Sequence, residues 1–481
     1  MRSVESSSWL RRGAPHVNGN RIVAGSLLLT AVVLGAWLRF QWLSAEQLTD
    51  DEGASWAAAH LHHIPAVIAA EPVLDPGKLA FYDVALHVWI RAFGDSLTAM
   101  RSLSALFGIA TIMLVFVAVR EICLSLSVEI PVELGEMAGA VAALLVAANP
   151  TLVDSARAAR MYSMLSAVEI AQIAFFVRAQ RWGKFSDYGG IAVCTAIAVA
   201  LNFTAAFLLI AEALWLSITL GLELSDRNRL GLRVFGPGLA VTAGLGLLAP
   251  FMPTALATAY VGMRFYLGWI QPQPLSWTYQ VLQQAADPFF AVLLAVGVLG
   301  LILGWRRGYP LSGVFIAVAW LMGPILACVL VTILVHPLEI SRYVTISFVG
   351  LFGLAGLGIA SLRSKVLAVI FTVFLAANWT SVERRNIAAL PGAYAWKEAV
   401  NTANPDGNVA VFPDYTINVI RYYLGPKREK FAVPANELGC ASSPTLIMSG
   451  RIFMPAADLA AQDKCYPNLV ERFNGVEVRR K

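Results

Sequence analysis

Residues 22–53 read IVAGSLLLTAVVLGAWLRFQWLSAEQLTDDEG, an apolar run that is followed by three consecutive acids. The run at 22–43 is long enough to cross a bilayer core of about 30 Å, for which a helix needs about 20 residues. It is longer than the apolar core of a signal peptide, and no small-residue cleavage site follows it. We therefore interpret it as an anchor that stays in the membrane, behind a polar N-terminus that contains Arg11 and Arg12.

The apolar character extends over most of the chain. Of its 481 residues, 58% are hydrophobic and only 14% are charged, and the mean hydropathy is +0.65. A soluble domain carries about 25% charged residues. The sequence therefore predicts an α-helical polytopic membrane protein with about eleven spans. The ten further apolar runs fall near 101–119, 137–149, 162–180, 187–202, 204–222, 234–253, 288–304, 311–335, 343–361 and 366–381.

Basic residues between the apolar runs predict the orientation, because cytoplasmic loops carry an excess of Lys and Arg. If residues 44–100 form one outer loop, the basic groups share the side of the N-terminus; they are Arg120, Arg178, Arg181, Lys184, Arg227, Arg229, Arg233, Arg306, Arg307, Arg363 and Lys365. A membrane crossing at 79–93 would place all of these basic groups on the outer side. That segment also carries three polar side chains, Asp83, His87 and Arg91. We expect two helices lying along the membrane in 44–100 and no span at 79–93.

This topology divides the chain into a cytoplasmic tail (1–20), a membrane domain (21–381) and an outer C-terminal domain (382–481). The C-terminal part has the pattern of a small α/β domain. Its expected elements are a helix at 393–399, a strand at 408–412, a helix at 417–424 and a strand at 445–448. It carries no catalytic motif of its own, so acceptor recognition or scaffolding is its expected role.

The acids Asp50, Asp51 and Glu52 directly follow the first span and form the strongest local signal. One interpretation is structural, since an Asp at the start of a helix satisfies free backbone N–H groups and favours the helix dipole. The other is chemical, since a positioned carboxylate can take the proton of an attacking hydroxyl group. The local sequence leaves both open.

Three further segments change this balance. Residues 75–83 read DPGKLAFYD, residues 149–165 read NPTLVDSARAARMYSML and residues 336–343 read HPLEISRY. In this order, and together with the acids after the first span, they resemble the GT-C membrane glycosyltransferases. The closest group is the glycosyltransferase-39-like bacterial family, with relatives of protein O-mannosyltransferases and the lipid A aminoarabinose transferase. The resemblance covers most of the chain.

The resemblance implies an inverting transferase that moves a sugar from a polyprenyl-phosphate donor to a glycolipid, polysaccharide or protein of the cell envelope. The reaction would occur at the periplasmic face of a bacterial inner membrane. The family's Asp-Glu pair matches Asp51 and Glu52, with Asp51 as the base toward the acceptor and Asp50 beside it. The sequence itself names neither the sugar nor the acceptor.

A leaving phosphate gains charge in the transition state, so cations aimed at it lower the barrier. Arg160 with Tyr162, and Arg342 with Tyr343, match positions of family motifs. Lys78 keeps the basic position of a family His-Pro-Pro-Leu-Tyr pattern whose prolines are lost here. Weaker candidates are Arg157, which would share a helix face with Arg160, and Arg264 in an aromatic stretch. For each, lipid head-group contact at the interface is the alternative.

Other functions stay open beside this one. A transporter or flippase of lipid-linked sugars would carry charges inside the membrane, where only Glu169 and Glu212 occur, and a non-catalytic scaffold would make the acids incidental. No pattern indicates nucleic-acid binding. No cofactor is certain; His60, His62 and His63 are more typical of an interfacial helix than of a metal site, although relatives leave a divalent cation open.

Cysteine placement predicts one disulfide. Of five cysteines, Cys440 and Cys465 are the two that the topology places outside the membrane, where the compartment is oxidising. The alternative is that both are buried, unpaired and simply apolar.

Overall fold

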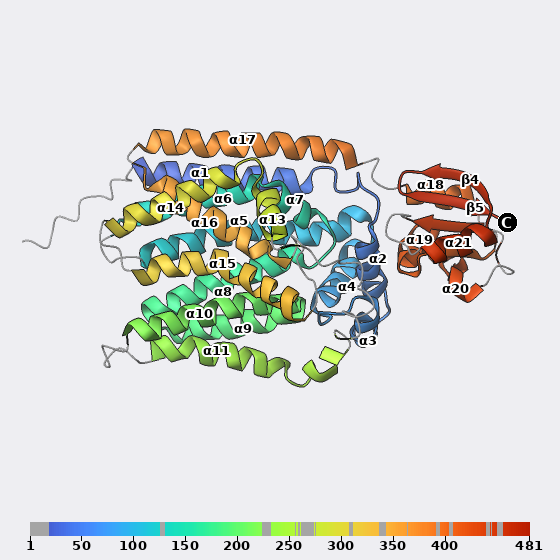
Figure 1. The fold of residues 1–481 in the computed structure, drawn as a ribbon, viewed down its shortest axis with the longest axis horizontal. Helices are drawn as coiled ribbons and strands as arrows, with labels where there is room; N and C mark the ends of the chain where they lie inside the picture. Colours follow the sequence, from blue (N-terminus) through green and yellow to red (C-terminus); the bar gives the residue numbers. More distant parts are fainter. Residues whose placement is uncertain are drawn as a thin grey trace, which may run out of the picture.

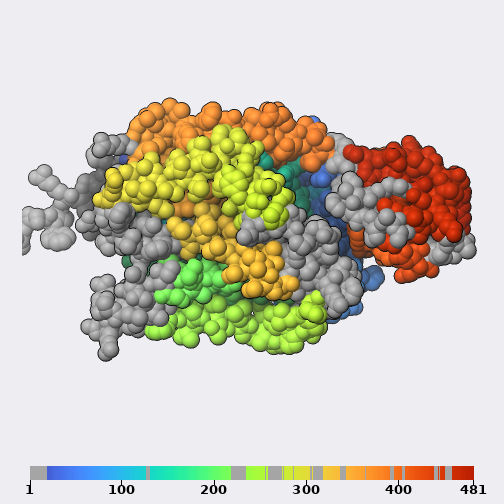
Figure 2. All heavy atoms as spheres, in the orientation of Figure 1, coloured from blue at the N-terminus to red at the C-terminus, as the bar shows by residue number. Residues whose placement is uncertain are grey.

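The computed structural model describes residues 19–125, 130–223, 232–254, 256–257, 260, 274, 276–306, 311–335, 343–362, 364–390, 395–403, 407–438, 443, 445–449 and 456–481. A long bundle of helices forms most of the molecule, and a small domain built on a sheet sits at one end of it (Figure 1). In the space-filling view this domain is a distinct lobe at the end of an elongated body (Figure 2).

Every predicted apolar run is a helix of the bundle. These helices are α1 (Gly19–Phe40), α5 (Leu97–Ser125), α6 (Val132–Ala148), α8 (Tyr162–Trp182), α9 (Phe185–Leu201), α10 (Ala206–Glu223), α11 (Leu232–Leu248), α14 (Phe290–Arg306), α15 (Leu311–Leu334), α16 (Thr345–Ala360) and α17 (Lys365–Ala389). Among the described residues, α1, α5 and α17 are each long and apolar enough to cross a membrane alone, and α6 with α7 (Pro150–Arg157), bent by 62°, would be a fourth if the bent pair is one span. Shorter apolar helices pack beside them, which confirms the polytopic membrane fold.

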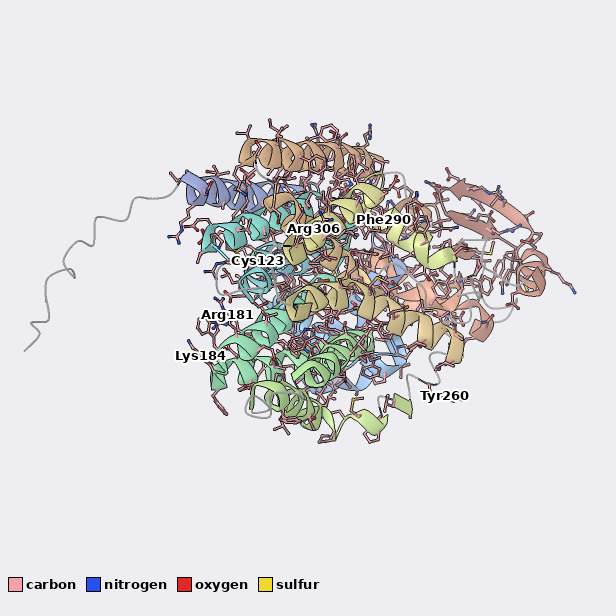
Figure 3. The ribbon with its side chains drawn as sticks, turned by 60° about the vertical axis from the view of Figure 1, so that its left-hand side comes forward. Cys123, Arg181, Lys184, Tyr260, Phe290 and Arg306 are labelled. Carbon is pink, nitrogen blue, oxygen red and sulfur yellow. The ribbon has the colours of Figure 1, made fainter. Side chains whose placement is uncertain are left out.

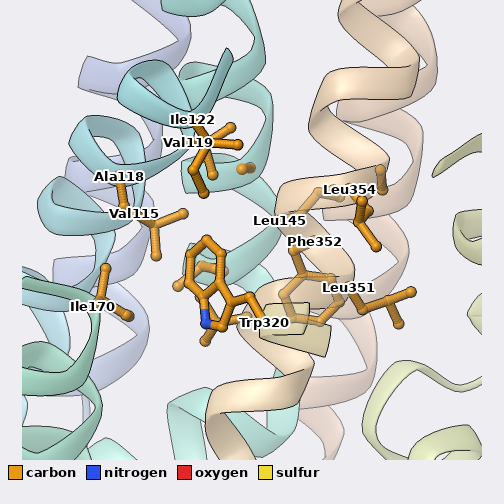
Figure 4. Packing of buried hydrophobic residues seen from close by; sticks show 14 of the residues in the cluster. Val115, Ala118, Val119, Ile122, Leu145, Ile170, Trp320, Leu351, Phe352 and Leu354 are labelled. Carbon is orange, nitrogen blue, oxygen red and sulfur yellow. The ribbon is translucent and has the colours of Figure 1, made fainter. Parts of the chain in front are cut away.

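The centre of the bundle is α6, which packs against α1, α5, α16 and α17. Small residues allow these close approaches, as is usual between membrane helices. A Cβ atom on Gly139 would lie 2.5 Å from the Phe116 carbonyl oxygen, and one on Gly356 would lie 2.6 Å from that of Ala138. Beside this seam, side chains of α5, α6, α8 and α16 gather around Trp320 of α15 (Figure 4).

Residues 44–100 form three short helices, α2 (Asp50–Ala59), α3 (Ile64–Leu74) and α4 (Phe81–Phe93), where two were expected. They gather at the end of the bundle that faces the sheet domain (Figure 1). The 13 residues of α4 span about 20 Å at 1.5 Å each, which is too short to cross a bilayer core. Helix α4 therefore belongs to this end cluster, and α13 (Ser276–Ala286) is a further short helix.

Two of the basic residues that predicted the orientation lie at the same end of the bundle. Arg181 and Lys184 lie at the end away from the sheet domain, whereas Tyr260 lies at the other end (Figure 3). Arg181 and Arg120 both contact Glu121 there.

The C-terminal domain is a mixed sheet with the strand order β2-β1-β3-β5-β4. Strand β5 pairs antiparallel with β3 and with β4, whereas β1 is parallel to β2 and β3. The expected helices and strands are present. The elements are α18 (Trp396–Ala403), β1 (Val409–Phe412), α19 (Ile417–Leu424), β2 (Ala432–Pro434), α20 (Ala435–Leu438), β3 (Thr445–Ser449), α21 (Ala456–Cys465), β4 (Asn468–Phe473) and β5 (Val476–Arg480), with 3-10 turns at Asp414–Thr416 and Glu429–Phe431. A further 3-10 turn, Phe203–Ala205, joins α9 to α10 in the bundle.

Candidate active site

The acidic stretch forms the first turn of α2, and a capping box fixes its start. The Thr49 hydroxyl accepts the backbone N–H of Glu52 at 3.3 Å, and the Glu52 carboxylate accepts that of Thr49 at 3.0 Å. Asp50 and Asp51 follow the cap directly, where the helix dipole favours negative charge. Both interpretations of the stretch thus keep a basis in the structure, because the cap uses Glu52 and leaves Asp51 exposed.

The Glu52 carboxylate accepts hydrogen bonds from two other segments of the chain. Its carboxylate receives both Nε and Nη2 of Arg101, each at 2.7 Å, and the backbone N–H of Ala159 at 2.8 Å. Burial alone would raise the pKa of Glu52, but the Arg101 contacts bring it below its ordinary value. The side chain is 1% exposed, so it binds α2 to α5 and to the segment after α7.

Arg157 and Arg160 do not share a helix face, which corrects the sequence prediction. Helix α7 ends at Arg157, and the chain continues in an extended conformation at Ala158 because the N–H of Ala159 is taken by Glu52. Arg157 donates to the Gln41 and Leu38 carbonyl oxygens at 2.5 and 3.1 Å, at the C-terminal end of α1. These contacts are those of a helix cap.

Arg160 turns the other way, toward α2. Its Nη1 donates to the Asp51 carbonyl oxygen at 2.9 Å and to the Ser55 hydroxyl at 3.0 Å, and Nη2 lies 2.7 Å from Asp75 Oδ2. The guanidinium is buried, and its Nε–H has no acceptor within the described part of the chain. A buried donor without an acceptor is costly, so this atom is suited to an anionic ligand. Tyr162 lies beside the group, with 6.0 Å between the Arg160 Cζ and the ring centre.

Lys78 lies among three carboxylates that the sequence prediction did not single out. Its Nζ atom is 2.6 Å from Asp83 Oδ2, 3.2 Å from Asp75 Oδ2 and 3.6 Å from Glu71 Oε1. Asp75 therefore bridges Lys78 and Arg160 and holds the two cations together. The available signal was sequence proximity: Asp75 and Asp83 flank Lys78 in DPGKLAFYD, and the turn at Gly77, with φ of 112°, brings them round it.

Burial and the neighbouring cations shift the pKa values of the acids in this region in opposite directions. It raises the pKa of Glu71 to about 8 despite Lys78, and it raises the pKa of Asp50 to about 7, with repulsion from Asp51 adding to the effect. Burial would also raise the pKa of Asp75, but Arg160 and Lys78 bring it below its ordinary value. Near pH 7, Glu71 is thus mostly neutral, and two cations face Asp75 and Asp83.

The remaining candidates lie apart or outside the description. Tyr343 packs against the apolar core of the bundle. Arg264, Arg342 and Cys440 lie outside the described residues, so their predicted roles stay predictions. Cys465 is disulfide-bonded, whereas Cys123, Cys194 and Cys328 are buried and form no disulfide.

His60 and His63 of the first loop make different structural contacts. The His63 ring caps α3 by accepting the Ala66 N–H at 3.1 Å, and His60 packs against Trp56 with ring centres 5.1 Å apart. Within the described ranges, no group of three or more His, Cys, Asp or Glu side chains is arranged to hold a metal ion.

No family model matches the chain, and no curated protein matches it in sequence. Solved structures match its fold. ArnT from Cupriavidus metallidurans, in the apo state, superimposes with a TM-score of 0.59 at 14% identity over 95% of this chain and 98% of that chain. The same protein bound to undecaprenyl phosphate gives 0.58 at 14% identity over 96% and 98%.

The archaeal oligosaccharyltransferase AglB from Archaeoglobus fulgidus, in complex with an inhibitory peptide and a dolichol-phosphate, gives a TM-score of 0.54 at 11% identity. That match covers 89% of this chain and 69% of AglB. The chain thus has the GT-C fold, and the resemblance seen in its sequence is confirmed at the level of the fold.

Proposed function

We propose that the chain is an inverting glycosyltransferase that moves a sugar from a polyprenyl-phosphate donor to an acceptor of the cell envelope. The observation that carries the proposal is the junction of Asp51, Arg160, Asp75 and Lys78, where an exposed acid adjoins two buried cations. The fold supports it, because ArnT binds undecaprenyl phosphate and AglB binds a dolichol-phosphate, which are both polyprenyl phosphates.

The proposed reaction is a single displacement. The acceptor hydroxyl oxygen attacks the anomeric carbon from the face opposite the phosphate, and its proton passes to the carboxylate of Asp51. The bond from the anomeric carbon to the phosphate oxygen breaks, and its electron pair leaves with the lipid phosphate. The configuration of the sugar is therefore inverted.

Lys78 and Arg160 have the role of stabilising that phosphate. Asp75 holds both cations before the donor arrives, so little reorganisation is needed during the reaction. The Arg160 Nε–H is the donor left for a phosphate oxygen. Neutral Glu71 lowers the negative charge beside the site, which favours an anionic donor. Glu52 acts through Arg101 and Ala159 by positioning α2.

The orientation and the remaining site residues belong to the same proposal. The end of the bundle with α2, α3, α4 and the sheet domain faces the periplasm, and the protein lies in a bacterial inner membrane. Arg181 and Lys184, which lie at the opposite end of the bundle, support this orientation, because basic residues favour the cytoplasmic side. Arg342 and Arg264 would complete the donor site, and a divalent cation stays open.

Transport of lipid-linked sugars is the alternative, and one observation favours it. Glu169 and Glu212 are buried in α8 and α10, where Gln172 donates to Glu212 at 2.9 Å. Intramembrane acids are common in transporters. Purified protein in vesicles that contain polyprenyl-phosphate sugars distinguishes the two. We expect free polyprenyl phosphate and a glycosylated acceptor; translocation of intact donor without release of sugar would favour transport. Mass spectrometry of envelope glycolipids from cells with and without the protein then identifies the sugar.

A further inference from the structure

We infer that the C-terminal sheet domain is a positioning unit for α2, and that it sets the place of Asp51 through contacts on both sides of the acidic stretch. The inference rests on the proposed function. Helix α19 of the sheet domain lies directly against α2, at the junction between the two parts of the molecule (Figure 1).

The contact after the acidic stretch is made by Gly53. A Cβ atom there would lie 2.8 Å from Val419 Cγ2 and 3.1 Å from the Val419 backbone nitrogen, both in α19. Gly53 lies inside a helix, where glycine is about 1 kcal/mol less favourable than alanine. The close approach of α19 therefore explains a glycine that local helix geometry disfavours.

The contacts before the acidic stretch involve Gln47 and Leu48. The Gln47 side chain donates to Glu398 Oε2 at 2.7 Å and accepts the Lys397 N–H at 2.8 Å, so it satisfies an N–H group at the start of α18. The Leu48 N–H donates to the Tyr423 hydroxyl of α19 at 2.8 Å. Two elements of the sheet domain thus hold the chain where it enters α2.

A third contact ties α19 to the bundle beside α2. The rings of Tyr422 and Trp56 meet edge to face at 5.4 Å. The Tyr422 hydroxyl donates to the Asp95 carbonyl oxygen at 3.3 Å, and Trp56 Nε1 donates to the Asp95 carboxylate at 3.4 Å. This junction is continuous with the core of the sheet domain, because Trp56 and Val419 belong to one cluster of buried apolar residues.

The bundle holds the same segment from the opposite side. Arg101 donates to the Leu43, Glu46 and Gln47 carbonyl oxygens at 2.6 to 3.1 Å, in addition to its pair with Glu52. Helix α2 is therefore clamped between Arg101 and α19. A displacement of about 1 Å at a catalytic group can cost about 10²-fold in rate, so losing one side of the clamp is expected to lower kcat.

The test is Gly53→Ala in the full-length protein, with sugar transfer and amide hydrogen exchange of residues 47–56 both measured. We expect kcat to fall at least about tenfold, KM for the donor to change less than about threefold, and exchange in α2 to rise. Gly25→Ala is the matched control, because Gly25 is also helical and a Cβ there meets nothing within 4 Å.

Two further variants separate positioning from loss of folding. Val419→Ala in the Gly53→Ala protein removes the nearest clashing atom, so it should restore much of kcat and slow exchange. Tyr423→Phe removes only the hydroxyl that accepts the Leu48 N–H and should lower kcat without unfolding the protein.

The possible results fall into three cases. An active wild type whose Gly53→Ala and Tyr423→Phe variants keep kcat and exchange would overturn the inference. An inactive wild type in which exchange still responds to Gly53→Ala, and recovers with Val419→Ala, would refute the proposed function and retain α19 as the unit that positions α2. An inactive wild type whose exchange does not respond would refute both.

Discussion

Glu52 and Arg101 form a two-point ion pair between α2 and α5, with both N–O distances at 2.7 Å and both side chains at most 3% exposed. The pair fixes the helix that bears Asp51 against the bundle. Removing one partner of a buried pair leaves an uncompensated charge and costs about 3–5 kcal/mol.

Arg101→Gln should therefore lower the thermal unfolding midpoint of the purified protein strongly, and activity with it. Arg472→Gln is the matched control, because the Arg472–Glu477 contact of 2.7 Å has an exposed arginine. Such surface pairs contribute about 0–1 kcal/mol. Equal losses in the two variants would contradict the structural role of the buried pair.

The raised pKa of Glu71 should make the stability of the protein depend on pH. Its pKa is raised to about 8 by burial, against about 4.3 in an unfolded chain. Between these values the folded state holds a proton that the unfolded state has lost, so this group makes the protein less stable as pH rises from about 4.3 to about 8. Glu71→Gln removes the dependence. The unfolding midpoint of the variant relative to wild type should rise between pH 5 and pH 8.5, and a flat or falling difference would contradict the assignment.

Arg157 and Arg160 should separate stability from activity. Arg157→Ala removes the donors at the end of α1 and should lower the unfolding midpoint. Arg160→Ala should instead weaken binding of polyprenyl phosphate and lower kcat/KM by at least about 10²-fold, because the lost hydrogen bonds are charge-assisted. For both variants, we measure thermal unfolding and the binding of polyprenyl phosphate in detergent. Equal effects of the two variants on lipid binding would remove the reason to assign the phosphate to Arg160.

The predicted Cys440–Cys465 bridge can be tested by counting the thiols that react before and after reduction. The bridge closes a loop of about 25 residues, for which the chain-entropy model gives roughly 3 kcal/mol. In unfolded, unreduced protein we expect labelling of Cys123, Cys194 and Cys328 alone, and of all five cysteines after reduction. Labelling of Cys440 before reduction would refute the pair and weaken the outer placement of the sheet domain.

Elements with a local signal were predictable from the sequence. The apolar runs became the bundle helices, and α19 matches the predicted helix at 417–424. Helix ends were less certain: α17 continues to Ala389, past the apolar run that stops at 381, because no helix-breaking residue interrupts it before Pro391. The charged side chains after the run do not end a helix.

Pairings between distant segments were not predictable. Nothing in DDEG indicates that Glu52 meets Arg101 in α5, or that it accepts the Ala159 N–H just after α7 has ended at Arg157. The carboxylates around Lys78 were visible in the sequence, but their convergence depends on the turn at Gly77. After Arg157, a tertiary contact overrides the local helical pattern.

Asp51→Asn tests the central claim most directly, because it replaces one carboxylate oxygen of an exposed side chain with an amide NH2 group and so removes the base. We measure thermal unfolding, binding of a polyprenyl-phosphate sugar and transfer to acceptor in the same purified protein. The account predicts an unfolding midpoint and donor affinity close to wild type, with transfer reduced about 10²- to 10⁴-fold, as expected for loss of a general base. A variant that folds, binds donor and transfers sugar at the wild-type rate would contradict the assignment of Asp51 and the reaction built on it.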